Sequence, residues 1–207
     1  MEIRKVSMKQ ELTEIVPGFP YLTYEQMNIL FNYQRLWTQL ATWMRSFIFS
    51  TFEESENLPA VTTRLFEKLL LDFYNAFRIF YGVDLSQQFL NALTKFLSNA
   101  WQLVNAYKND DTSLINSSTI QWYQSADELA RFLAQVNFYW NEGQWRNLFY
   151  QYIRLKIQEI IAIRGGNYEQ EIEIYDRIED LTTIMGSYMA RGIIARNIFA
   201  PQNGIQE

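Results

Sequence analysis

Apolar residues recur at helical spacing along most of this chain. From residue 23 onward they lie three, four or seven positions apart, which places them on one face of an α-helix. No segment alternates apolar and polar residues between turn signals, so we expect no β-sheet. The pattern predicts helices over about 23–51, 59–81, 84–108, 118–136, 143–164 and 167–199.

Signals for helix ends agree with this division. Residues 23–26 and 118–121 read Thr-x-x-Gln and Ser-x-x-Gln, the capping-box pattern of a helix N-terminus. Pro59 suits a first helical turn, and the Gly-Gly pair at 165–166 suits a helix C-cap. The chain has only 8 Gly and 4 Pro, so turns are few. We therefore predict an all-α fold, an antiparallel bundle of about six helices.

Domain organisation follows from the same pattern. Residues 23–199 should form a single helical-bundle domain, followed by a tail over 200–207. Residues 1–22 should form an arm, because two prolines and a glycine between positions 17 and 20 prevent regular structure there. The apolar residues of this arm could swap onto a neighbouring subunit, fold back on their own bundle, or remain loose.

A shift of 56 residues superimposes several apolar positions. It lays Leu40 on Phe96 and Phe96 on Tyr152, together with further matches along the same helices. Three tandem helical hairpins of about 56 residues would produce this pattern. The alternative is that amphipathic helices match whenever their apolar stripes are aligned.

The chain contains no histidine and no cysteine. It therefore lacks the usual general base near neutral pH, the thiolate nucleophile and the ligands of most zinc sites. No motif among the remaining polar residues specifies a reaction. We therefore expect a non-enzymatic binding or assembly protein, with a homodimer or other homo-oligomer as the expected partner arrangement.

Charge and hydropathy narrow the partners and the compartment. The net charge of −5 argues against a nucleic-acid surface, which needs clustered Lys and Arg. Residues 1–14 are charged and lack the apolar region of a secretory signal. The chain has no run of 18 apolar residues, so we expect no transmembrane segment. The expected location is the cytoplasm.

The helix over 23–51 is apolar on most of its sides, which predicts a central, buried position. A buried Arg45 needs a carboxylate partner, for which Glu128, Asp176 and Asp180 are the candidates. This arginine would form a structural ion pair or, alternatively, bind an anionic ligand among aromatic walls. The candidate ligand-binding residues are Gln39, Trp43, Arg45, Asp127, Glu128, Asp176, Glu179 and Asp180.

The helix over 167–199 carries an acidic ridge. Glu169, Glu173, Asp176 and Asp180 are spaced four, three and four residues apart and so share one helical face. Such carboxylates could hold a hard divalent cation such as Mg²⁺ or Ca²⁺. The alternative is a solvated face whose charge suits a helix N-terminus. No cofactor is predicted other than this cation.

Three groups of segments resemble a bacterial protein family. They are residues 36–40 with 43–48, residues 137–140 with Trp145, and residues 175–180 with Met185, Tyr188, Met189, Gly192 and Ile193. They are similar to an uncharacterised family of small all-helical proteins, common in clostridia, whose members often carry the label acetylglutamate kinase. The resemblance covers about residues 21–197. The label has no support here, because the chain has no glycine-rich phosphate loop and no predicted parallel sheet.

The resemblance also gives three positions a meaning. Members of the family often carry histidines on three helices, at the positions of Leu40, Phe96 and Tyr152 in this chain. Three inward histidines would form a metal or cofactor site, which this chain cannot inherit. The sequence leaves open whether these three residues line a pocket or only pack.

Overall fold

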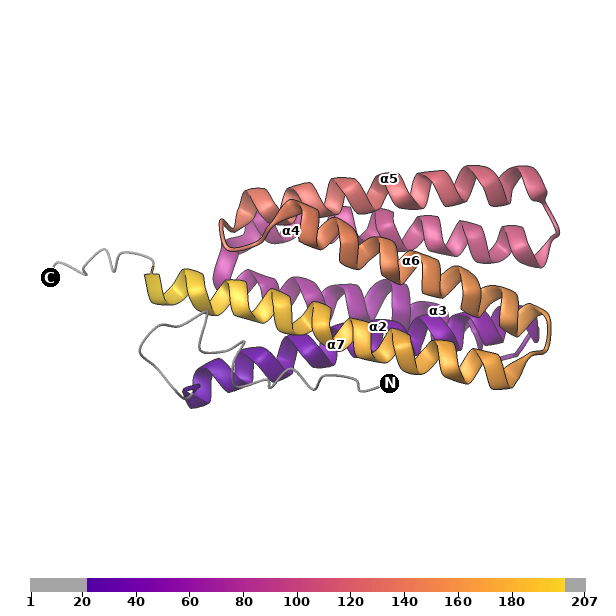
Figure 1. Ribbon diagram of the computed structural model, residues 1–207, viewed down its shortest axis with the longest axis horizontal. Helices are drawn as coiled ribbons and strands as arrows, with labels where there is room; N and C mark the ends of the chain where they lie inside the picture. The colour runs from indigo at the N-terminus through magenta and orange to yellow at the C-terminus, as the bar shows by residue number, and fades with distance from the viewer. Residues whose placement is uncertain (1–21, 200–207) are drawn as a thin grey trace, which may run out of the picture.

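A computed structural model describes residues 22–199, and these residues are almost entirely helical, with no strand among them (Figure 1). The prediction of an all-α fold is therefore confirmed. The predicted arm and tail lie outside the described residues, apart from Leu22. The elements are α2 (Tyr24–Phe52), α3 (Leu58–Thr63), the π-helical segment η1 (Arg64–Leu69), α4 (Leu70–Lys108), α5 (Thr112–Val136), α6 (Glu142–Arg164) and α7 (Tyr168–Phe199).

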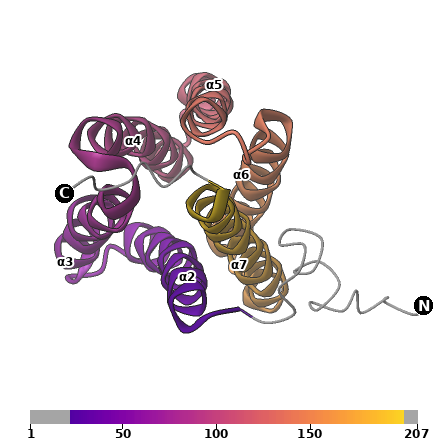
Figure 2. The ribbon, with the colours of Figure 1, turned by 90° about the vertical axis from the view of Figure 1, so that its left-hand side faces the viewer.

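The long helices lie alongside one another in an elongated bundle (Figure 1). Helix α2 packs on α7, α4 on α5, and α6 on both α5 and α7. Seen along the bundle, α2 and α5 lie on opposite sides (Figure 2). The first and last described helices are thus direct neighbours, although they are far apart in the sequence.

Helix α4 folds back on itself at Gly82. Its backbone there has φ 75° and ψ −177°, and the legs on either side lie side by side, as the stacked rings of Phe77 and Phe89 show, 4.5 Å apart. The two legs are the helices predicted over 59–81 and 84–108. Residues 22–199 therefore form five long helices where the sequence predicted about six, because this reversal occurs without a loop.

We expect Gly82→Ala to destabilise the protein by roughly 1–3 kcal/mol. A φ of 75° with ψ near 180° belongs to a region that is almost exclusive to glycine, although a Cβ here would meet no neighbouring atom. Asn, which tolerates only the left-handed helical region, should not rescue the fold. Urea denaturation measures the effect, with the exposed neighbour Val83→Ala as control. A Gly82→Ala variant as stable as that control would contradict the backbone argument.

The predicted helix ends agree with the structure at three places and fail at one. Thr23 and Gln26 form the capping box of α2, Pro59 lies in the first turn of α3, and Gly165 caps α6. The capping box predicted at Ser118 is wrong, because this residue is buried inside α5. Helix α5 begins earlier, at Thr112, where the Asp111 side chain accepts a hydrogen bond from the Leu114 amide at 2.9 Å.

Aromatic side chains fill the core. Trp37, Trp122, Trp140 and Trp145 are almost fully buried, and Trp145 stacks on Phe149 with ring centroids 5.3 Å apart. Such rings remove large apolar areas from water and account for much of the stability of a core. The helices that carry them are therefore held in fixed positions around any site between them.

Helices α2 and α7 approach each other closely at Gly186. A Cβ added there would lie 2.5 Å from Gln34 Cα and 2.7 Å from Tyr33 O, both on the backbone of α2. The neighbouring Ser187 Oγ accepts a hydrogen bond of 2.9 Å from Gln34 Nε2. Glycine thus lets two helix backbones meet where any other residue would hold them apart.

Candidate functional site

Helices α2 and α7 run antiparallel and place Arg45 against Glu171. The guanidinium donates two hydrogen bonds to this carboxylate, of 2.6 Å from Nε and 2.7 Å from Nη2. The carboxylate side chain is 1% exposed, whereas that of the arginine is 32% exposed. Hydrogen bonding to Glu171 raises the pKa of Arg45. The pair is a bidentate ion pair that joins α2 to α7, the first and the last described helix.

A second ion pair lies deeper, on α6. Lys156 Nζ is 2.7 Å from Glu159 Oε2, and both side chains are 0% exposed. The same ammonium donates a hydrogen bond of 3.2 Å to the Ala41 carbonyl on α2. Burial lowers the pKa of Lys156 and raises that of Glu159, because desolvation penalises the charged form of each. Their mutual attraction opposes both shifts.

Two tyrosines surround these charges. The Tyr175 ring lies 4.4 Å from Arg45 Cζ and 5.8 Å from Lys156 Nζ, and its hydroxyl is 3.0 Å from Thr42 Oγ1. The Tyr152 ring lies 5.8 Å from the same ammonium. Cation–π attraction to these rings therefore stabilises the charged forms of Arg45 and Lys156. Burial raises the pKa of Tyr152 most, and the nearby Glu159 carboxylate raises it further.

Two buried polar atoms at this place have no hydrogen-bond partner among the described residues. They are the Tyr152 hydroxyl and Glu159 Oε1. The other carboxylate oxygen, Oε2, is held by Lys156. We call Arg45, Lys156, Glu159 and Glu171 the charged cluster. Its two cations can neutralise its two anions. The pair of Arg45 and Glu171 joins α2 to α7, and the pair of Lys156 and Glu159 lies within α6.

The sequence predicted part of this cluster. A buried Arg45 was expected to need a carboxylate partner, and it has one; the rings of Tyr175 and Phe49 lie beside the guanidinium. The partner is Glu171, however, and not one of the three acids that the sequence favoured. The candidate Glu128 instead bonds Lys95 on α4, at 2.6 Å. The choice depended on how far α7 is shifted along α2, which periodicity alone does not give.

The other candidate residues lie at separate places. Asp127 Oδ1 accepts hydrogen bonds from Arg146 and Tyr150 on α6, of 2.8 and 2.9 Å. Gln39 accepts one of 3.2 Å from Arg64, whose guanidinium lies 5.5 Å from the Trp43 ring. The structure therefore does not bring the eight candidates together in one pocket. The remaining acids are exposed on α7, namely Asp176, Glu179 and Asp180.

The acidic ridge of α7 is a solvated face. Glu169, Glu173, Asp176 and Asp180 are all exposed. Within residues 22–199, no three carboxylates converge closely enough to hold a metal ion. The exposure of all four residues agrees with the alternative of a solvated face, although only Glu169 lies in the first turn of α7, where a negative charge favours the helix dipole.

Leu40, Phe96 and Tyr152 pack in the core. All three are fully buried, and the rings of Phe96 and Tyr152 lie 6.2 Å apart. Trp122 covers both, at 5.6 Å from Phe96 and 6.4 Å from Tyr152. Each of these three positions is therefore occupied by a side chain that packs in the core.

The buried residues of the cluster had an overlooked signal. Lys156 lies seven residues after Phe149 and seven before Ile163, so it continues the apolar stripe of α6. Glu171 likewise lies seven residues before Ile178 on α7. Because the spacing of seven repeats one helix face, a charge at such a position is expected to be buried. Reading the register through the polar residues would have found both.

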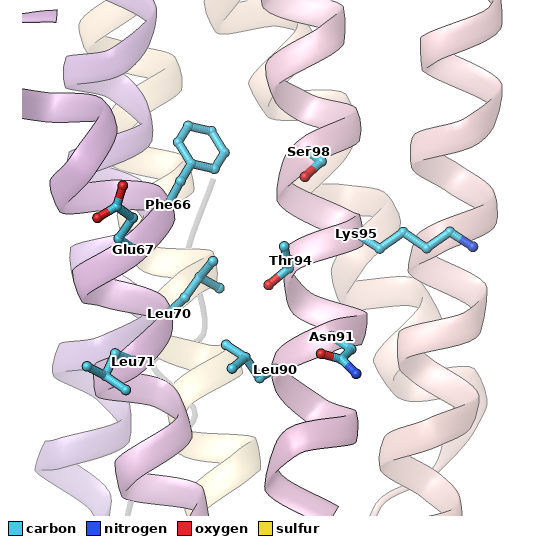
Figure 3. A pocket seen from close by; sticks show the side chains of 9 residues that line it. All are labelled: Phe66, Glu67, Leu70, Leu71, Leu90, Asn91, Thr94, Lys95 and Ser98. Carbon is cyan, nitrogen blue, oxygen red and sulfur yellow. The ribbon is translucent and has the colours of Figure 1, made fainter. Parts of the chain in front are cut away.

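Two neighbouring hollows lie between the second leg of α4 and the wall formed by η1 and the first leg, and Figure 3 shows the larger of them. The larger, of about 610 Å³, has Phe66, Leu70 and Leu71 on one wall and Leu90 on the other. The adjoining hollow, of about 490 Å³, shares Phe66 and Ser98 with it and is bounded by Trp101. We call the two together the α4 groove. Segment η1 supplies part of its wall, and π-helical turns often occur at functional positions.

Comparison with known proteins gives no family for this chain. It matches no family model, no curated protein and no solved structure. Among the described residues, no helix is both long and apolar enough to cross a membrane. The function must therefore be argued from the charged cluster and the α4 groove.

Proposed function

We propose that this chain is a non-enzymatic assembly protein that forms a homodimer through the α4 groove. The observation that carries the proposal is an apolar hollow open to solvent in a protein whose core is otherwise filled by aromatic packing. Leu71 and Trp101 on the groove are 53% and 44% exposed. Exposed apolar surface of this kind marks interaction sites, and tryptophan is enriched at their centres.

Charge on the groove favours a second copy of the chain as the occupant. Glu67 lies on one wall, and Lys95 lies on the other, where its side chain points away from the hollow towards Glu128 of α5 (Figure 3). In a two-fold interface the same surface meets itself, so Glu67 of each protomer can attract Lys95 of its partner once the exposed ion pair between Lys95 and Glu128 opens. Two α4 hairpins packed in this way would form a four-helix layer whose apolar residues leave water.

We expect Leu71→Lys to shift the protein from dimer to monomer. A lysine at the groove would bring a charge into the apolar contact, and the substitution is on the surface, so the fold should persist. Ile184→Lys on α7 is the matched control, because that side chain is also 53% exposed. Light scattering across a range of protein concentrations measures the mass. A wild-type mass that stays monomeric at near-millimolar concentration would overturn the proposal.

A charge exchange tests the two-fold geometry itself. In a Glu128→Gln background, which removes the in-chain carboxylate partner of Lys95, Glu67→Lys should weaken the dimer by placing like charges together, and adding Lys95→Glu should restore it. A double variant that stays as weak as the single variant would show that these two walls do not meet in the dimer.

The proposal extends to the internal repeat and to the setting. Three hairpins related by 56 residues are supported by the equal burial of Leu40, Phe96 and Tyr152 on three separate helices. We keep the bacterial cytoplasm expected from the sequence as the compartment. The alternative function is a site for a small anionic ligand. The arginines that favour it are Arg154 and Arg177, which line a polar pocket, and not Arg45.

A further inference from the structure

A small polar pocket lies between α6 and α7. It encloses about 230 Å³, and its walls differ from those of the α4 groove in being mostly polar. Helix α6 contributes side chains at spacings of three, four and seven, which lie on one helical face, and α7 contributes one. The lining residues are Gln151, Arg154, Leu155, Gln158 and Arg177.

The two arginines of this pocket are unpaired within residues 22–199. Neither guanidinium has an ion pair or a hydrogen bond there, whereas Arg45, Arg64 and Arg146 each bind a carboxylate. Arg177 has Glu173 and Asp180 one turn away on its own helix, yet it pairs with neither of them. Both residues are exposed, so water and not a carboxylate solvates their guanidinium groups, and both groups are available to an anion in the pocket.

We propose that this pocket binds a small phosphate-bearing anion. Two guanidinium groups from different helices can each donate a pair of parallel hydrogen bonds to a tetrahedral oxyanion. The amides of Gln151 and Gln158 supply further donors on the same face. The volume is below that of pockets for drug-sized molecules, so the ligand is inorganic phosphate or a small phosphate monoester.

Binding of inorganic phosphate to the whole chain tests this proposal by isothermal titration calorimetry, with chloride holding the ionic strength constant. Arg154→Gln and Arg177→Gln should each weaken binding about tenfold or more, because each removes a charged fork. Arg154→Lys, which keeps the charge and loses the fork, should bind with intermediate affinity. Arg131→Gln is the control, because Arg131 is exposed on α5 and does not line this pocket.

Each outcome bears on the pocket. Saturable binding that both glutamine variants weaken, and that Arg131→Gln leaves unchanged, supports it. A second titration with glycerol phosphate assigns the source, since tighter binding than inorganic phosphate indicates an organic monoester. No phosphate-specific heat in the wild type, or an equal loss in Arg131→Gln, would overturn the proposal, because the effect would then be absent or due to general charge.

Discussion

Replacing Lys156 with methionine should lower the free energy of unfolding by about 3–5 kcal/mol. The substitution leaves the Glu159 carboxylate in the core without its cation, and one of its oxygens already lacks a partner. Removing one member of a buried ion pair typically costs this much, because the remaining charge has neither water nor a counter-charge. Urea denaturation at neutral pH measures the change.

The double variant Lys156→Met, Glu159→Leu should recover that loss. Replacing both members of a buried pair with apolar groups of similar volume is often neutral or stabilising, by roughly 1–4 kcal/mol. Glu171 and Arg45 keep each other as partners, so the rest of the charged cluster remains paired. A double variant as unstable as the single one would contradict this account and would assign the pair a role in the packing of α6.

The advantage of the double variant should depend on pH. Burial raises the folded-state pKa of Glu159. Its contribution to the free energy of unfolding is therefore fully present below a pH of about 4.5, the ordinary pKa of glutamate, and is lost as pH rises through the raised pKa. Burial lowers the folded-state pKa of Lys156. Its contribution to the free energy of unfolding is therefore fully present above a pH of about 10.5, the ordinary pKa of lysine, and is lost as pH falls through the lowered pKa. The wild type therefore bears both penalties between these values, and the double variant should gain most there. A difference that is constant with pH would contradict the assignment.

Gly186→Ala should lower the free energy of unfolding by roughly 3 kcal/mol, at the upper end of the range for overpacking. The three atoms nearest to an added Cβ all belong to the backbone of α2, at 2.5–2.7 Å, so no side chain can turn away to make room. Helices α2 and α7 would have to separate, which would strain the hydrogen bond between Gln34 and Ser187 and loosen the contacts beside it.

Helix propensity makes the opposite prediction for this position. Alanine is favoured over glycine in a helix interior by about 1 kcal/mol, so a stabilised Gly186→Ala variant would show that the two helices do not meet closely. Ser187→Ala is the neighbouring control. It removes one hydrogen bond to Gln34 without adding volume and should cost only about 1 kcal/mol. Thermal unfolding of the two variants separates steric contact from loss of polar contact.

Helix positions and buried faces were predictable because periodicity is a local property. Thr23, Pro59 and Gly165 marked ends correctly, since each acts on the backbone next to it. Ser118 misled because residues 112–117 carry no clear apolar stripe, although Asp111 starts the helix before them.

The features of the candidate site that were predictable are those that depend on the sequence of a single helix. The need of Arg45 for a carboxylate follows from its place on an apolar helix. Its partner Glu171 depends on how α7 is shifted along α2, which arises from packing between distant segments. The α4 groove was not predictable, because the π-helical turn that forms part of its wall has no local sequence signal, although the two helices on either side of Gly82 were expected.

The contact of α2 with α7 sets the order in which the chain can fold. Gln34 bonds Ser187, Thr42 lies against Tyr175, and Arg45 bonds Glu171, over separations of 126 to 153 residues. The adjacent hairpins of α4, α5 and α6 can form from nearby segments, whereas this contact closes a loop that contains all of them. Until α7 has been synthesised, the apolar side of α2 and the guanidinium of Arg45 stay without their partners. A growing chain that still lacks α7 therefore exposes this face of α2, which favours aggregation.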